Sequence, residues 1–326
     1  SQTGMFELRI KVNMSNSTQN NKSFWQRLWV YQNERFPLLG NGVMIAAFTF
    51  SAVSYSRICR GASGFIHWSD FLIGIFATVT LFFLVRIFDE FKDQEDDAKY
   101  RQYLPVPRGL VNLKELRTVG WSVGLLQIAI IAFFQPQMLP LYALVLAYLC
   151  LMGVEFFVPE WLKQRQILYI TSHMFIIPLI DLYASGLDWK LDGDSPHWGL
   201  VWFFAVSYMN GLVLEFGRKI RTPETEEEGV VSYTKLYGTK GGTVTWMTLM
   251  LVTMLLAMGA SHYAGYSWLA YVILGVFFVL CSLIGFSFLK TPTQKRSKQI
   301  EYASAAWTAL MYLSLGGVPM LTELIG

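Results

Sequence analysis

The hydrophobic residues of this chain gather into long runs separated by shorter polar stretches. A helix needs about 20 apolar residues to cross the hydrocarbon core of a bilayer. Runs of about that length cover residues 37–57, 69–91, 115–135, 138–158, 164–184, 196–217, 242–261, 264–289 and 302–323. The pattern therefore predicts an all-α polytopic membrane protein with nine transmembrane helices, and the lipid bilayer as its environment.

The composition supports a membrane domain. Of the 326 residues, 53% are hydrophobic and only 15% are charged, whereas soluble domains carry about a quarter charged residues. Residues 1–30 are polar and lack the apolar region of a signal peptide. We expect a partly disordered polar tail over residues 1–30 and one transmembrane domain over residues 31–326. The three cysteines and four histidines are scattered, which favours neither a disulfide framework nor a zinc site.

Positive charges alternate along the chain. The N-terminal stretch and the loops after the second, fourth, sixth and eighth runs, together with Arg117 and Arg165 at the starts of the following runs, carry 22 of the 26 Lys and Arg residues. The positive-inside rule assigns these segments to the cytoplasm, so we expect a multi-pass protein of a bacterial inner membrane with a cytoplasmic N-terminus. Because topology explains these cations, they give no reason to expect a nucleic-acid partner.

Six acidic residues lie within residues 89–97, which we call the first acidic segment. Asp89, Asp93 and Asp97 are spaced i, i+4, i+8, which places them along one face of a helix, with Glu90 beside them. Stacked carboxylates repel one another, and bound Mg²⁺, which prefers oxygen ligands, relieves that repulsion. A solvated helix end balanced by nearby lysines is the alternative. We predict these four acids as Mg²⁺ ligands and the three aspartates as catalytic residues.

Cations flank the same segment. Arg101 and Arg108 follow within a few turns, and Arg35 precedes the first run. A metal ion together with Arg or Lys is a usual clamp for a diphosphate leaving group. We therefore predict that these three arginines bind substrate.

The second acidic segment, residues 215–228, follows the sixth run. Glu215, Arg218 and Lys219 lie on the end of that helix, and Pro223 stops it before a group of glutamates. A simple i, i+4 helix pair and a solvent-facing acidic loop are the alternatives. The substrate-binding candidates of this region are Arg218, Lys219, Tyr233 and Lys235. Two amides within apolar runs, Asn41 and Asn210, need polar partners and are further substrate-binding candidates.

The motif "DEFKDQEDD" at residues 89–97, with "LPVPRGLV" at residues 104–111, resembles the UbiA superfamily of intramembrane prenyltransferases. That family's first motif reads N-D-x-x-D-x-x-x-D, with Asp89 here in the Asn place and Glu90 in the first Asp place. Its second motif normally carries aspartates, where this chain has glutamates and cations. The resemblance implies that the metal ligands of this segment are Glu215, Glu224 and either Glu228 or Glu226.

The resemblance implies nine helices around a central cavity and an isoprenoid diphosphate held through Mg²⁺ by both acidic segments. It further implies ionisation of that diphosphate and transfer of the prenyl group to an acceptor, whose identity the sequence leaves unknown.

Three other functions fit parts of the pattern. A UbiA-type terpene cyclase would keep the ionisation step without an acceptor, and the divergent second segment keeps this reading open. A transporter fits less well, because the acids gather at one membrane face and no matching interrupted helices indicate inverted repeats. A CDP-alcohol phosphotransferase would show D-x-x-D-G-x-x-A-R, which this chain lacks.

Overall fold

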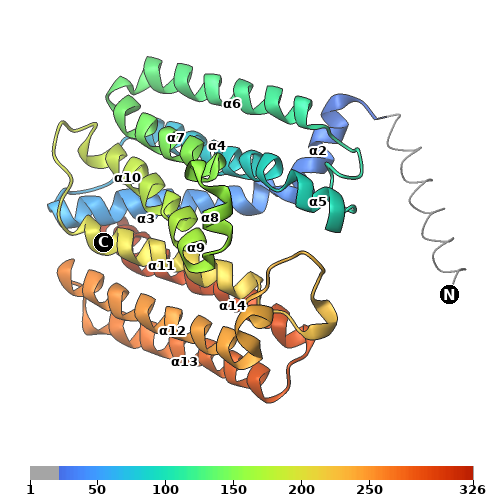
Figure 1. Ribbon diagram of the computed structural model, residues 1–326. Coiled ribbons are helices and arrows are strands. Elements are labelled where there is room, and N and C mark those ends of the chain that lie inside the picture. The colour runs from blue at the N-terminus through green and yellow to red at the C-terminus, as the bar shows by residue number, and fades with distance from the viewer. Residues whose placement is uncertain (1–21, 326) are drawn as a thin grey trace, which may run out of the picture. The chain divides into compact units, whose positions relative to one another are not determined.

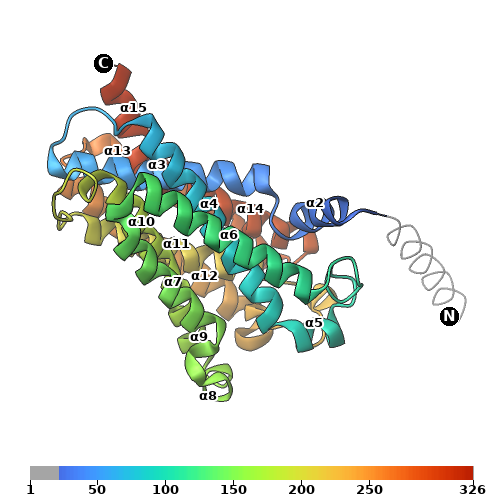
Figure 2. The ribbon, with the colours of Figure 1, turned by 90° about the horizontal axis from the view of Figure 1, so that it is seen from above.

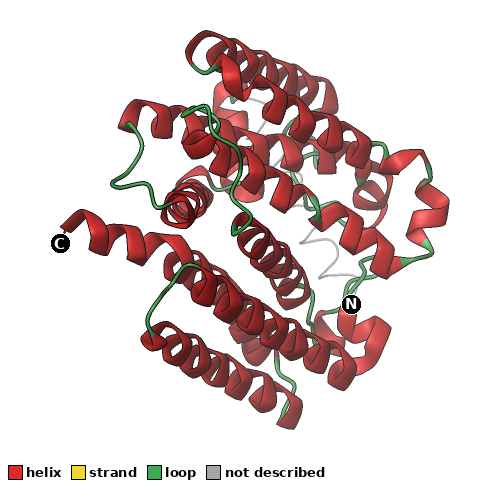
Figure 3. Cartoon of the chain, turned by 90° about the vertical axis from the view of Figure 1, so that its left-hand side faces the viewer, coloured by secondary structure: helices red, strands yellow, loops and turns green. Residues whose placement is uncertain are grey.

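The computed structural model describes residues 22–325, and these form helices joined by loops, with no strand among them (Figures 1 and 3). Within this described range, nine helices are long and apolar enough to cross a membrane. They are Leu38–Arg60, Trp68–Lys92, Leu113–Phe134, Pro136–Gly153, Gln166–Trp189, Leu200–Arg218, Tyr233–Tyr263, Trp268–Lys290 and Gln294–Ile325. The all-α membrane architecture is confirmed. Most of the predicted polar tail, residues 1–21, lies outside the described residues.

The individual elements subdivide these spans. They are, in chain order, α2 (Phe24–Arg35), α3 (Leu38–Arg60), α4 (Trp68–Lys92), α5 (Gln94–Tyr100), α6 (Leu113–Phe134), η1 (Pro136–Met138), α7 (Leu139–Gly153), η2 (Glu155–Phe157), α8 (Pro159–Lys163), α9 (Gln166–Met174), α10 (Ile176–Trp189), α11 (Leu200–Arg218), η3 (Pro223–Thr225), α12 (Tyr233–Tyr263), α13 (Trp268–Lys290), α14 (Gln294–Tyr312), η4 (Leu313–Gly317) and α15 (Val318–Ile325).

The chain divides into two compact units, and each is described by itself. Unit 1 comprises residues up to 43 and 79–129, and unit 2 comprises residues 44–78 and 130–326. Unit 1 therefore holds the first acidic segment, and unit 2 holds the second.

Unit 1 is organised around α2 and its neighbours. A capping box at Ser23 starts α2, and Tyr31 on that helix belongs to a buried apolar cluster with Ile87 and Leu116. An ion pair of 2.6 Å between Arg27 and Glu115 links α2 to the start of α6. These contacts position the end of α2, which carries Arg35, beside the first acidic segment.

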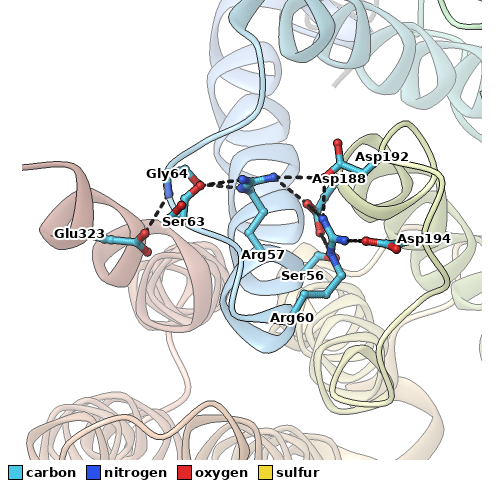
Figure 4. Close-up of polar contacts among 9 residues, drawn as sticks. All are labelled: Ser56, Arg57, Arg60, Ser63, Gly64, Asp188, Asp192, Asp194 and Glu323. Atoms are coloured by element: carbon cyan, nitrogen blue, oxygen red, sulfur yellow. Dashed lines mark hydrogen bonds and ion pairs between the residues drawn. The ribbon is translucent and has the colours of Figure 1, made fainter.

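Unit 2 contains a buried charge cluster where α3 and α10 end (Figure 4). Asp188, which is fully buried, accepts hydrogen bonds from Arg57 at 2.9 Å and from two nitrogens of Arg60 at 2.7 and 3.0 Å. The Ser56 hydroxyl donates to the same carboxylate at 2.7 Å. Four donors therefore satisfy one buried carboxylate, as its removal from water requires.

Candidate functional site

Glu90 is the centre of a charge network in unit 1, near the end of α4. Its side chain is 1% exposed, and its Oε1 atom accepts hydrogen bonds from Arg35 at 2.6 Å and Arg86 at 2.8 Å. The Tyr31 hydroxyl donates to the same atom at 3.4 Å, and burial raises the pKa of that hydroxyl. Glu90 thus fixes two guanidinium groups beside the first acidic segment.

Asp97 is the second buried acid of that segment. It pairs with Arg101, and Arg35 Nη2 lies 3.9 Å from its Oδ2 atom. Burial raises the pKa of Asp97 to about 6, and the opposing effect of Arg101 is smaller. Arg35 therefore contacts both buried acids, Glu90 and Asp97.

The other two predicted ligands are more open. Asp89 has a 30% exposed side chain, and Arg86 and Lys92 lie 3.5 and 3.6 Å from its carboxyl oxygens. Asp93 is half-buried and lies in the turn that separates α4 from α5. The continuous helix expected through Asp97 is therefore interrupted at Asp93.

The donor chemistry of this segment fits Mg²⁺. In the part of the chain that the structure describes, no group of three or more His, Cys, Asp or Glu side chains is arranged to hold a metal ion. Magnesium usually takes only one or two carboxylates and completes its shell with water and substrate phosphates. The more exposed pair, Asp89 and Asp93, suits that arrangement, whereas Glu90 and Asp97 hold arginines. The metal role of all four residues stays a prediction.

The Arg108 guanidinium is paired with a carboxylate. Its two Nη atoms bind the two carboxyl oxygens of Glu34 at 2.9 and 2.7 Å, and it also donates to the carbonyl of Tyr103. A paired fork of this kind matches a phosphate as well as a carboxylate. Asn41, the other candidate of unit 1, is half-buried on α3.

In unit 2, Glu215 organises the end of α11. It is buried, and Arg218 and Lys219 lie 2.5 and 2.6 Å from its two carboxyl oxygens. The Lys219 ammonium also lies 6.0 Å from the ring centre of Tyr233, and that ring stacks on Phe216 at 3.8 Å. Three of the predicted residues therefore share one contact group with Glu215.

The glutamates after Pro223 lie in a loop. Glu224 is exposed, and hydrogen bonds from its own backbone N–H and from Thr222 lower its pKa. Glu228 and Lys235 are also exposed. Glu226, the alternative to Glu228 in the second motif, is half-buried and accepts a hydrogen bond from Ser232 at 2.9 Å.

Asn210 lies in a buried polar cluster deeper in α11. The hydroxyls of Ser207 and Tyr312 are 2.7 Å apart, and Asn210 neighbours Tyr312. The Asp181 carboxyl lies beside Ser207 and is fully buried. Asn210 and Asp181 therefore belong to one buried polar cluster with Ser207 and Tyr312.

Sequence reasoning missed several partners in these networks. Arg86 lies inside the second apolar run and was not predicted, although its position four residues before Glu90 is a usable signal for a helix pair. Glu34 and Tyr31 reach the site through the fold of α2, and the sequence carries no comparable signal for them.

Comparisons with known proteins now complement this geometry. The model of the UbiA prenyltransferase family matches residues 35–315. No curated protein sequence matches significantly.

Two solved structures share the fold at 15% sequence identity. One, from work on digeranylgeranylglyceryl phosphate synthase in membranes, has a TM-score of 0.60 and covers 90% of this chain and 99% of that chain. The other, the apo structure of a UbiA homolog from Aeropyrum pernix K1, has a TM-score of 0.62 and covers 86% of this chain and 98% of that chain. At this level of identity the likeness concerns the fold alone.

Proposed function

Because this chain belongs to the UbiA prenyltransferase family, we propose that it is a Mg²⁺-dependent enzyme that ionises an isoprenoid diphosphate and transfers the prenyl group to an acceptor. The observation that carries the proposal is the network of Arg35, Glu90 and Asp97. It holds cations in place beside two more open aspartates, Asp89 and Asp93. Such pre-positioned charge is what the departure of a diphosphate needs.

The residues of unit 1 have separable roles in this proposal. Mg²⁺, when held by Asp89 and Asp93, would neutralise charge on the departing diphosphate. Arg101 binds the diphosphate oxygens, and Arg108 exchanges its carboxylate partner Glu34 for a phosphate. Arg218 and Lys219 in unit 2 are likewise proposed to bind phosphate oxygens through their positive charges.

The reaction breaks the C–O bond between the prenyl group and the diphosphate, which leaves with both bonding electrons. The acceptor's nucleophilic atom then bonds to the allylic carbon and loses a proton. Exclusion of water protects the cation until that bond forms. From the predicted topology we propose that both acidic segments face the cytoplasm.

The test is diphosphate release by the purified protein supplied with geranyl, farnesyl or geranylgeranyl diphosphate, with Mg²⁺ or with EDTA. Release that needs both Mg²⁺ and a membrane lipid extract, with a prenylated lipid as product, supports the transferase. A cyclic hydrocarbon or terpene alcohol formed without the extract would instead identify a cyclase. No Mg²⁺-dependent release and no binding of any of these diphosphates would refute the proposal.

A further inference from the structure

Helices α7, α8 and α9 follow one another along the chain in unit 2 (Figure 2). Side chains of these helices and of the turn between α7 and α8 line an apolar pocket of about 420 Å³. Its wall includes four aromatic rings and the side chain of Leu168; the rings belong to Tyr148, Phe156, Trp161 and Phe175. Small-molecule sites commonly enclose about 300–1,000 Å³ and have mainly apolar and aromatic walls. The pocket is largely open on one side, and its volume and lining suit an apolar chain.

The backbone beside the pocket is held in a conformation that side chains disfavour. Glu155, Phe156 and Phe157 have φ angles of 48°, 54° and 62°, and none of them is glycine. Three successive left-handed residues persist only where the surrounding structure imposes them, and such strain gathers at binding and active sites. Here the strained turn places the ring of Phe156 against that of Tyr148, with centroids 5.6 Å apart.

Hydrogen bonds to the pocket's own backbone fix its back wall. The transmembrane helix is interrupted between α9 and α10, near Phe175. The Tyr148 hydroxyl donates to the Ser172 carbonyl at 2.7 Å, and the Tyr208 hydroxyl donates to the Thr171 carbonyl at 3.3 Å. Two tyrosines thus satisfy carbonyls of lining residues and hold this wall in place.

The same wall packs on the face of α11 that carries the second acidic segment. Tyr208, Gly211 and Glu215 are spaced i, i+3, i+7 and so lie on one face of the helix. The Tyr208 ring contacts Phe175, and a side chain at Gly211 would meet Met174 of α9 within 3.3 Å. Glu215, with Arg218 and Lys219, lies two turns further along that face, about 10 Å away by helix geometry.

The rim of the pocket is basic. The Arg165 guanidinium lies 4.3 Å from the ring centre of Trp161, which lines the pocket. Lys163 is exposed on the adjoining α8. The Arg165 guanidinium also donates to the Trp161 carbonyl at 3.1 Å, and one exposed acid, Glu160, lies on the same helix as Lys163. Exposed cations beside an apolar site complement an anionic headgroup.

We propose that this pocket binds the acceptor of the prenyl group, and that the acceptor is an amphiphile with one apolar chain and an anionic headgroup. This inference rests on the proposed function and specifies its missing substrate. The chain packs among the aromatic rings, while the headgroup meets Lys163 and Arg165 at the end of the pocket. An even number of spans separates the end of α7 from the end of α11, so both ends face the same side of the membrane.

The binding test uses the full chain in phosphatidylcholine nanodiscs and radiolabelled lysophosphatidic acid as probe. Leu168→Trp fills the pocket, and Ile167→Trp is its matched control, because Ile167 is the neighbouring exposed residue outside the lining. We expect Leu168→Trp to weaken binding at least tenfold and the control to bind as the wild type does. Equal binding by both variants would show contact with bulk lipid only and would overturn the inference.

A second pair of measurements tests the headgroup. It changes exposed residues and leaves the lining of the pocket intact. Replacing both exposed cations, Lys163→Gln with Arg165→Gln, should remove the preference for lysophosphatidic acid over uncharged monoacylglycerol. An unchanged preference would overturn the anionic assignment.

The pocket and the proposed function fail separately. Specific binding without diphosphate release would refute the prenyltransferase while leaving an amphiphile site. If the wild type releases diphosphate, and Leu168→Trp does so with the same KM for the lipid extract, the acceptor pocket alone is refuted.

Discussion

The Nε atom of Arg35 lies 2.6 Å from a carboxyl oxygen of Glu90, and this contact ties the end of α2 to the end of α4. The two residues are 55 positions apart, so the pair exists only in the folded chain. Glu90 also holds Arg86, which makes one buried carboxylate the counter-charge for two guanidiniums.

Glu90→Gln should therefore destabilise the protein strongly. Removing one partner of a buried ion pair costs about 3–5 kcal/mol when the remaining charge has no other partner. Asp97 and Asp89 stay 3.9 and 3.5 Å from Arg35 and Arg86, so we expect a loss at the lower end of that range, about 3 kcal/mol. We expect the thermal midpoint in detergent to fall by several degrees. Glu95→Gln, at an exposed position of α5, is the control and should have the same thermal midpoint as the wild type. Equal midpoints for the two variants would contradict the central role of Glu90.

Asp93→Ala should lower diphosphate release by about 100-fold or more, in the range seen when one preorganised charge-stabilising group is lost. Asp93 is half-buried at the turn between α4 and α5, so little packing is lost and the thermal midpoint should hardly move. Release is measured at saturating Mg²⁺, with the exposed Asp96→Ala as control. Near-normal turnover by Asp93→Ala would remove this residue from the catalytic assignment.

Asp97 should make stability depend on pH in metal-free buffer. Burial raises the pKa of its carboxyl from the ordinary 3.8 to about 6 in the folded protein, so the folded state binds the proton more tightly than the unfolded state. The resulting stabilisation is complete below about pH 4 and is lost as the pH rises through about 6.

Thermal midpoints of the wild type and Asp97→Asn between pH 4 and 7 measure this effect. As the pH rises across that window, the thermal midpoint of the wild type should fall relative to that of Asp97→Asn. A constant difference would mean that Asp97 does not titrate there.

Asp188→Asn should also destabilise the protein by about 3–5 kcal/mol, since Arg57 and Arg60 would share a neutral partner in a buried site. Asp192 contacts the same arginines, but its side chain is 51% exposed. Chemical unfolding of Asp192→Asn should therefore show a loss of at most about 1 kcal/mol. The prediction fails if the two variants lose similar stability.

Hydrophobic runs were enough to predict the membrane architecture, because a span needs little more than length and apolarity. They missed the interruption between α9 and α10, since apolar residues continue on both sides of Phe175. The left-handed turn at residues 155–157 was also not predicted. Glycine or asparagine usually indicates left-handed backbone, and neither is present there.

The candidate site was predictable only in part. The spacing of Asp89, Asp93 and Asp97 shows acids near one another, but it does not show which acids are buried. Glu90 and Asp97 are both buried against Arg35, which approaches from α2. A sequence pattern gives neither the approach of α2 nor the pairing of Arg108 with Glu34.

The buried cluster at Asp188 also bears on the order in which the protein is made. Arg60 on α3 leaves the ribosome 128 residues before its partner on α10. At about 5–20 residues per second, translation takes roughly 6–25 seconds to supply that carboxylate. During this interval the first transmembrane helix carries two cations without their counter-charge, so this end of the bundle becomes complete only after the fifth span has been synthesised.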